Sequence, residues 1–220
     1  MAYRRLPNTD NARLLAILKL NELLSDDDSV LKNYKEKIID HTSIFKKLIE
    51  KRDAYKIKRR ALNKQKKELL LRLKIYVSHF LQVFNFAIDR GDIDKECRKF
   101  FELRTNTGVI PPLSKESDII KWSHRIVAGE QKRIVKGAEV ISHPNFTQIQ
   151  RITIATDKVI ADLKILDDLF RIYQEEIAGQ RVIVDDFIKQ LWNEIEFQYV
   201  NEPIAIKRKK ATQYGVVYVE

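Results

Sequence analysis

Apolar residues recur with a seven-residue period from Ser29 to Arg90, a stretch that contains no Gly or Pro. One set begins at Tyr34 and continues through His41, Leu48, Tyr55, Leu62, Leu69, Tyr76 and Val83. Four residues after members of this set stand Ile38, Phe45, Leu73, Phe80 and Ala87. The spacing places both sets on one face of a helix and predicts a helix that packs side by side with others.

A single helix over Ser29–Arg90 would be about 90 Å long at 1.5 Å per residue. The alternative is a helical hairpin that turns between Arg59 and Lys67, where the apolar face thins and Asn63 can adopt a turn conformation. We favour the continuous helix, because the seven-residue phase is kept across this region and a loop would not need to keep it.

A shorter helix is predicted before this stretch. Thr9 or Asp10 can cap it, and its apolar face continues to about Leu24. The acidic segment Ser25–Ser29 ends it, and the carboxylates of this segment also suit the positive end of the helix that follows. At the other end of the long stretch, Gly91 can adopt the left-handed conformation that terminates a helix.

The second half of the chain repeats this plan after a short helix at Asp92–Leu103 and a linker at Thr105–Leu113. A helix capped by Ser114 or Ser117 is expected to end near Gly137, and a long one covers Thr147 to about Val200. Ile38 falls on Ile149 and Leu48 on Val159 under a constant shift of 111 residues. The repeated order of elements indicates an internal duplication.

The predicted fold is therefore all-α, an elongated antiparallel helical bundle of two similar halves, each with a short and a long helix. The predicted divisions are a first repeat over 1–104, a linker over 105–113, a second repeat over 114–200 and a basic segment with a strand-like tail over 201–220. The tail from Gln213 to Glu220 is rich in β-branched and aromatic residues and reads as a strand. Its partner is either Ala2–Leu6 or another chain, because a lone strand is unstable.

Three cations interrupt the apolar seam of the first long helix: Arg52, Arg59 and Lys66. Three unpaired charges would not be buried. Either this part of the helix is thinly covered and exposed, or acidic residues of the second long stretch face it. The candidates for that pairing are Asp167, Asp168, Glu175 and Glu176.

The net charge of +10 is uneven, with a basic helix face over residues 51–74 and a second basic cluster at Lys207–Lys210. The single cysteine, Cys97, gives no sign of an oxidising compartment. The N-terminus does not resemble a signal peptide, and no window approaches the roughly 18 apolar residues of a membrane span. We expect a cytoplasmic protein that does not enter a membrane.

The sequence predicts no catalytic residues, no metal site and no cofactor. Glu-x-x-His pairs, phosphate-binding glycine loops and Cys/His clusters are all missing from it. The pairs Ser78-His79, Ser123-His124 and Ser142-His143 are neighbours in the chain and point about 100° apart on a helix, which prevents nucleophile–base pairing. Seam residues such as His41, Tyr55 and Tyr173 are expected to be core residues rather than ligands.

A helical interaction or scaffold protein without enzymatic activity is the leading hypothesis, with self-association or an unknown protein partner. The alternative is non-specific binding of nucleic acid or another polyanion, since clustered cations attract phosphate backbones. The candidate residues for that role are Lys56, Lys58, Arg59, Arg60, Lys64, Lys66 and Lys67. The interpretation without a binding function is that these residues form a solvated helix face and pair with acidic side chains of the other half. A third alternative is an enzyme whose site forms between the halves.

Several segments resemble those of an uncharacterised family of bacterial all-helical proteins. They are the opening Tyr3–Asp10, the run Tyr76–Val83, the triplet Gly129–Gln131, the segment Leu191–Glu194 and the closing Tyr214–Val219. The resemblance covers nearly the whole chain. It implies a helical fold and brings no activity, ligand or catalytic residue.

Overall fold

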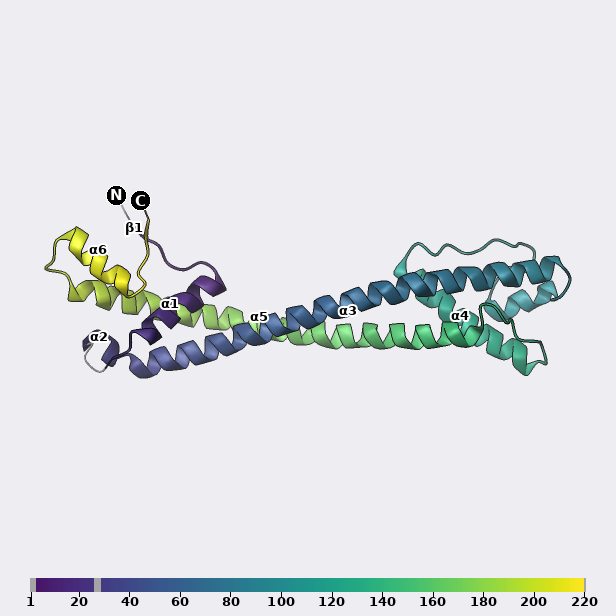
Figure 1. Cartoon of the computed structure of the whole chain (residues 1–220), viewed down its shortest axis with the longest axis horizontal. Coiled ribbons are helices and arrows are strands. Elements are labelled where there is room, and N and C mark those ends of the chain that lie inside the picture. The colour runs from purple at the N-terminus through teal and green to yellow at the C-terminus, as the bar shows by residue number, and fades with distance from the viewer. Residues whose placement is uncertain (1–2, 26–28, 220) are drawn as a thin grey trace. The chain divides into compact units, whose positions relative to one another are not determined.

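Helices make up most of the computed structural model, which describes residues 3–25 and 29–219 (Figure 1). The fold is all-α, as predicted. In chain order the elements are β1 (Tyr3–Arg4), α1 (Asp10–Glu22), α2 (Ser29–Lys32), α3 (Lys35–Asp89), the 3-10 helix η1 (Lys95–Phe101), α4 (Glu116–Val135), α5 (Phe146–Gln198), α6 (Ile204–Gln213) and β2 (Tyr218–Val219). None of the described helices is both long and apolar enough to cross a membrane.

The two long helices confirm the main prediction from periodicity. Helix α3 contains 55 residues and α5 contains 53. The hairpin alternative is therefore wrong, because α3 continues without interruption through Asn63. Its start was placed too early: the chain forms the single turn α2, then a turn at Asn33–Tyr34, before α3 begins.

Glycine ends α3 as expected from the sequence. Gly91 has φ +85°, and the amide of Asp92 donates to the carbonyl of Ala87 at 2.9 Å. This bond and the one from Gly91 to Ile88 form a Schellman motif, which satisfies carbonyls left free at a helix end. Gly137 has the same φ after α4. Gly179, by contrast, lies inside α5 without breaking it.

The predicted helix caps and short helices agree with the structure in part. The Thr9 hydroxyl accepts the amide of Ala12 at 3.1 Å and caps α1, as expected. The cap predicted at Ser114 or Ser117 is wrong, because Lys115 takes the N-cap position of α4 and no side chain caps it. The helix predicted at Asp92–Leu103 is the shorter η1, capped by Asp94. Residues 26–28 of the predicted acidic turn lie outside the described residues.

The chain forms two compact units that cut across both long helices. The first unit contains Met1–Ile57 and Asp168–Glu220, and the second contains Lys58–Asp167. These units follow packing and do not coincide with the predicted repeats over 1–104 and 114–200. The internal duplication, which concerns sequence likeness, stays a prediction.

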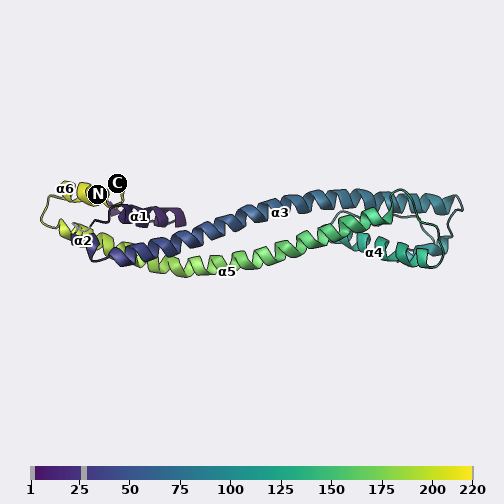
Figure 2. The same ribbon diagram turned by 60° about the horizontal axis from the view of Figure 1, so that its bottom comes forward.

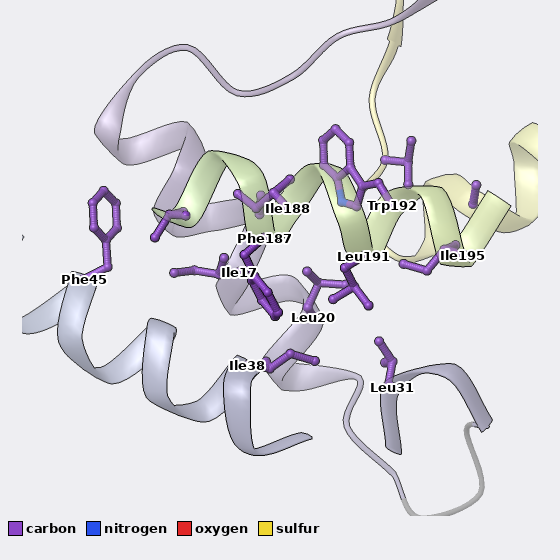
Figure 3. Packing of buried hydrophobic residues seen from close by; sticks show 14 of the residues in the cluster. Ile17, Leu20, Leu31, Ile38, Phe45, Phe187, Ile188, Leu191, Trp192 and Ile195 are labelled. Carbon is purple, nitrogen blue, oxygen red and sulfur yellow. The ribbon is translucent and has the colours of Figure 1, made fainter. Parts of the chain in front are cut away.

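In the first unit, α1, α2 and α6 pack on the N-terminal part of α3 and the C-terminal part of α5. Contacts of Tyr34 with Phe187 and of Tyr55 with Tyr173 show that α3 and α5 run antiparallel there. The core contains fully buried Ile17, Leu20, Leu31, Ile38, Phe45, Leu191 and Ile195, and Trp192 is 1% exposed (Figure 3).

The first and the last described residues pair with each other in the first unit. Strand β1 pairs antiparallel with β2, with Tyr3 opposite Val219. The predicted N-terminal partner of the tail is therefore confirmed within residues 3–6. The predicted strand over Gln213–Glu220 is too long, because α6 continues to Gln213 and β2 contains only Tyr218–Val219. The basic cluster Lys207–Lys210 lies on α6.

In the second unit, α4 and η1 pack against the C-terminal part of α3 and the N-terminal part of α5 (Figure 2). Gly129 allows a close approach: a Cβ built there would lie 2.6 Å from the carbonyl oxygen of Phe100. The predicted linker Thr105–Leu113 lies inside this unit. Asn85 donates to the carbonyl of Gly108 at 2.7 Å, and the guanidinium of buried Arg98 donates to that of Thr107 at 2.6 Å.

Candidate functional site

The seven candidate cations all lie on α3, Lys56 in the first unit and the other six in the second. Three of them pair with carboxylates. Lys56 contacts Asp53 at 3.2 Å, Lys66 contacts Glu116 of α4 at 3.0 Å, and Arg59 pairs with Asp167 of α5. These three cations act partly as ordinary surface salt-bridge partners, which contribute little to stability.

The proposed acidic partners of the interrupted seam are confirmed for one cation. Arg59 pairs with Asp167, as expected. Arg52 is instead 7% exposed and pairs with Asp10 of α1 and Asp53. Lys66 pairs with Glu116 on α4, and Asp168 pairs with Arg171 of its own helix. The pairs of Arg52 with Asp10 and of Lys66 with Glu116 join distant segments and leave no periodic pattern in the sequence. Asp53 and Arg171, by contrast, are close in the chain to the residues that they pair with.

Other candidate cations are exposed and have no carboxylate within salt-bridge distance among residues 3–25 and 29–219. They are Arg60, Lys64 and Lys67, and Lys74 shares this property. Lys58 is exposed too, but it takes part in an interaction. Arg60, Lys67 and Lys74 are spaced by seven residues, so they lie on one face of α3 about 10 Å apart. We refer to Arg60, Lys64, Lys67 and Lys74 as the basic stripe.

The net charge of the chain belongs almost wholly to the second unit. Residues 58–167 contain 22 Lys and Arg against 13 Asp and Glu, a net charge of +9. The first unit has 19 against 18, a net charge of +1. The basic stripe is therefore part of a unit whose own acidic residues do not neutralise it.

A second charged cluster, which sequence reasoning missed, surrounds Asp10 in the first unit. Its carboxylate accepts hydrogen bonds from Arg181 Nε at 2.7 Å and Nη2 at 3.0 Å, and another from the guanidinium of Arg52. The hydrogen bond from Arg181 holds the pKa of the Asp10 carboxyl below its usual range. Arg13 makes a bidentate pair with Asp185 beside it, at 2.7 and 2.8 Å. This network ties α1 to both long helices and has a structural role.

The buried charged and polar side chains of the second unit also have a structural role. Glu130 and Arg133 form a bidentate ion pair with side chains 0% and 2% exposed. They lie near Cys97, and burial raises the pKa of its thiol, which leaves less of the reactive thiolate. Ser123 is buried, and its hydroxyl donates to the carbonyl of Ile120 rather than to a histidine.

The titratable seam residues His41, Tyr55 and Tyr173 are half-buried and lie against other rings, so they are not the core residues that were expected. The ring of His41 lies 4.6 Å from that of Phe187, and burial lowers its pKa. The rings of Tyr55 and Tyr173 are 5.2 Å apart. His124 pairs with Asp157 at 3.2 Å. Within the described part of the chain, no three His, Cys, Asp or Glu side chains gather in a way that could hold a metal ion.

The sequence matches no protein-family model, and comparisons with curated proteins and with solved structures find no similar chain. The resemblance to an uncharacterised bacterial helical family therefore stays a prediction.

Proposed function

We propose that this chain is a helical interaction protein whose second unit binds a polyanion, with the phosphate backbone of nucleic acid as its ligand. The observation that carries the proposal is the basic stripe: exposed cations on one helix face without carboxylate partners among the described residues. The charge of +9 on the same unit supports it.

The physical basis is the release of counterions from the phosphate backbone. Each cation that neutralises a phosphate releases condensed ions, so the affinity falls steeply as salt concentration rises. Cations spaced by about 10 Å along a rigid helix can contact several phosphates along a backbone without rearranging. A stripe of this kind contacts the backbone and not the base edges, so sequence-independent binding is expected.

The test compares two triple variants that lose the same charge. The first is Arg60→Gln, Lys67→Gln and Lys74→Gln in the basic stripe. The control is Lys37→Gln, Lys47→Gln and Lys189→Gln, three exposed lysines of the first unit. Binding of a labelled 20-base-pair duplex is measured by fluorescence anisotropy between 50 and 200 mM salt, at about 25 °C.

We expect the slope of log affinity against log salt to become shallower by up to about 2.7 in the stripe variant, at about 0.9 per lost contact. The control is expected to keep the wild-type slope. Equal losses in both variants would show that net charge alone attracts the duplex and would reject the stripe as the site. Absence of binding by the wild type at 50 mM salt would reject the proposed function itself.

Self-association or a protein partner, the leading expectation from the sequence, is a second candidate. Exposed large apolar side chains favour it, among them Leu15 (67% exposed), Ile154 (62%) and Phe197 (69%). Sedimentation velocity over a hundredfold range of protein concentration tests self-association. A sedimentation coefficient that stays constant at the monomer value would remove it.

A further inference from the structure

Two depressions open along the same helix of the second unit and share one residue, Tyr76 of α3. The first has a volume of about 360 Å³ and lies between α3 and the N-terminal part of α5. The second has a volume of about 460 Å³ and lies between α3 and the loop that holds His143 and Pro144. Since Tyr76 lines both, the two depressions are neighbours on α3, and we refer to them together as the Tyr76 groove.

The first part of the groove is cationic. Arg72 from α3 and Arg151 from α5 line it together with Gln148, and no carboxylate does. Both arginines are exposed, and the described residues offer neither of them a salt bridge. The guanidinium of Arg72 lies 5.9 Å from the centre of the Tyr76 ring, which orients it at the edge of the groove. Two guanidinium groups from different helices form a suitable site for a phosphate.

The second part of the groove is lined by flat rings. Tyr76, His79, Phe86 and His143 contribute to it, again without a carboxylate. The side chain of Phe86 is 59% exposed, which leaves its ring open to a ligand. Aromatic and imidazole rings provide surfaces on which nucleic-acid bases stack.

We propose that the Tyr76 groove binds single-stranded nucleic acid, with a phosphate on Arg72 and Arg151 and adjacent bases on the rings of Tyr76 and Phe86. This inference rests on the proposed function and names its preferred ligand. A duplex keeps its bases stacked inside and presents only phosphates to a protein surface of this kind. An unpaired strand presents both the phosphates and the flat base surfaces that the two parts of the groove match.

The experiment uses the full chain and three ligands of equal phosphate number: a single-stranded DNA 12-mer that cannot pair with itself, a self-complementary 12-mer that folds into a hairpin duplex, and inorganic polyphosphate. One base of the single strand is replaced by 2-aminopurine, whose fluorescence falls when it stacks. Three variants are compared with the wild type: Arg72→Gln/Arg151→Gln, Tyr76→Leu and Phe86→Ala. Leucine keeps apolar contact with the core that Tyr76 packs against.

Two variants serve as matched controls. Arg60→Gln/Lys67→Gln removes two charges from the basic stripe instead of the groove. Phe197→Ala removes an exposed ring from the first unit, where Phe197 is 69% exposed. Circular dichroism confirms that each variant keeps its helices, so that a loss of binding is not a loss of folding.

We expect the single strand to bind more tightly than the duplex and its 2-aminopurine to be quenched. Tyr76→Leu and Phe86→Ala should each weaken single-strand binding about fivefold or more and abolish most of the quenching. Phe197→Ala should change neither. Arg72→Gln/Arg151→Gln should make the single-strand salt slope shallower by about 1.4, at about 0.7 per contact. It should also weaken the single strand more than Arg60→Gln/Lys67→Gln does.

Failure of this inference is distinguishable from failure of the proposed function. Equal binding of single strand and duplex, without quenching, would overturn the groove and leave the basic stripe in place. The same holds if polyphosphate competes as well as the single strand, because the bases would then contribute nothing. A wild-type protein that binds none of the three ligands at 50 mM salt would overturn both proposals.

Discussion

The buried ion pair of α4 allows a stringent test of the packing in the second unit. Glu130 accepts Arg133 Nε at 2.9 Å and Nη2 at 2.7 Å, and its Oε1 also accepts the amide of Ile141 at 3.1 Å. The same Arg133 nitrogen donates to the carbonyl of Glu139. The pair therefore fastens the segment after α4 to the helix itself.

The substitution Glu130→Gln keeps the shape of the side chain and removes its charge. The new amide group has one acceptor and one donor, whereas every neighbour of Glu130 is a donor. One N–H must then point at another donor, and Arg133 keeps a buried charge without a counterion. Breaking a buried pair in this way destabilises a protein by about 3–5 kcal/mol.

The measurement is unfolding in urea, followed by circular dichroism and by tryptophan fluorescence, to which Trp122 of the same helix and Trp192 of the first unit both contribute. The control is Asp168→Asn, which breaks an exposed pair of the same spacing with Arg171, both side chains being more than 60% exposed. This variant should unfold almost as the wild type does. The double variant Glu130→Met/Arg133→Met should recover most of the lost stability, because no charge is then buried.

A loss below about 1 kcal/mol in Glu130→Gln would refute this reasoning, since it lies well under the range for a broken buried pair. The pair would then be hydrated in solution. A double variant as unstable as the single one would show that packing and hydrogen bonds, rather than the uncompensated charge, hold this region.

Three further predictions concern other contacts. Gly129→Ala should destabilise the second unit by about 1–3 kcal/mol, because the added methyl group collides with the backbone of η1; thermal unfolding measures this. Asp10→Asn should be less stable than the wild type at neutral pH, and urea unfolding at a series of pH values should show the difference shrinking below pH about 4. The pKa of Asp10 is lowered chiefly by Arg181, which means that the ionised carboxylate stabilises the fold and that this contribution is lost once the carboxyl is protonated. Burial and the hydrogen bond to Glu196 raise the pKa of Tyr218, so the wild type should lose stability above pH about 10. The variant Tyr218→Phe should be less stable by about 1 kcal/mol at neutral pH but should not show that loss at high pH.

The long helices could be predicted because their signal is local and repeated. Each turn of α3 carries its own apolar residues, and no Gly or Pro interrupts them. Gly91 and Thr9 were equally readable, since a cap depends on a few neighbouring residues. Errors occurred where the local signal was weak, as at Ser114 and Ser117, which lie beside the N-terminus of α4 without capping it.

Most long-range side-chain partners could not be predicted, and the pair of Arg59 with Asp167 is an exception. Asp10 pairs with Arg52, 42 residues away, and with Arg181, 171 residues away. Nothing in the spacing of the three residues relates them, because the pairing depends on how the helices meet. The Tyr76 groove was missed for a similar reason: Arg72 and Arg151 gain their common site only when α3 and α5 pack together.

The interruption of the apolar seam, which the sequence did reveal, explains why the chain divides into two units. On α3 the first core ends at Ile49 and the second begins at Leu70. Between them the buried residue of α3 is Arg52, because the seam positions that follow hold Arg59 and Lys66 in place of apolar residues. Cations at these positions must pair or remain in water, so they cannot continue a core. Cations at seam positions thus separate the two hydrophobic cores along α3. They also leave positive charge of the second unit at the surface, where the proposed polyanion would bind.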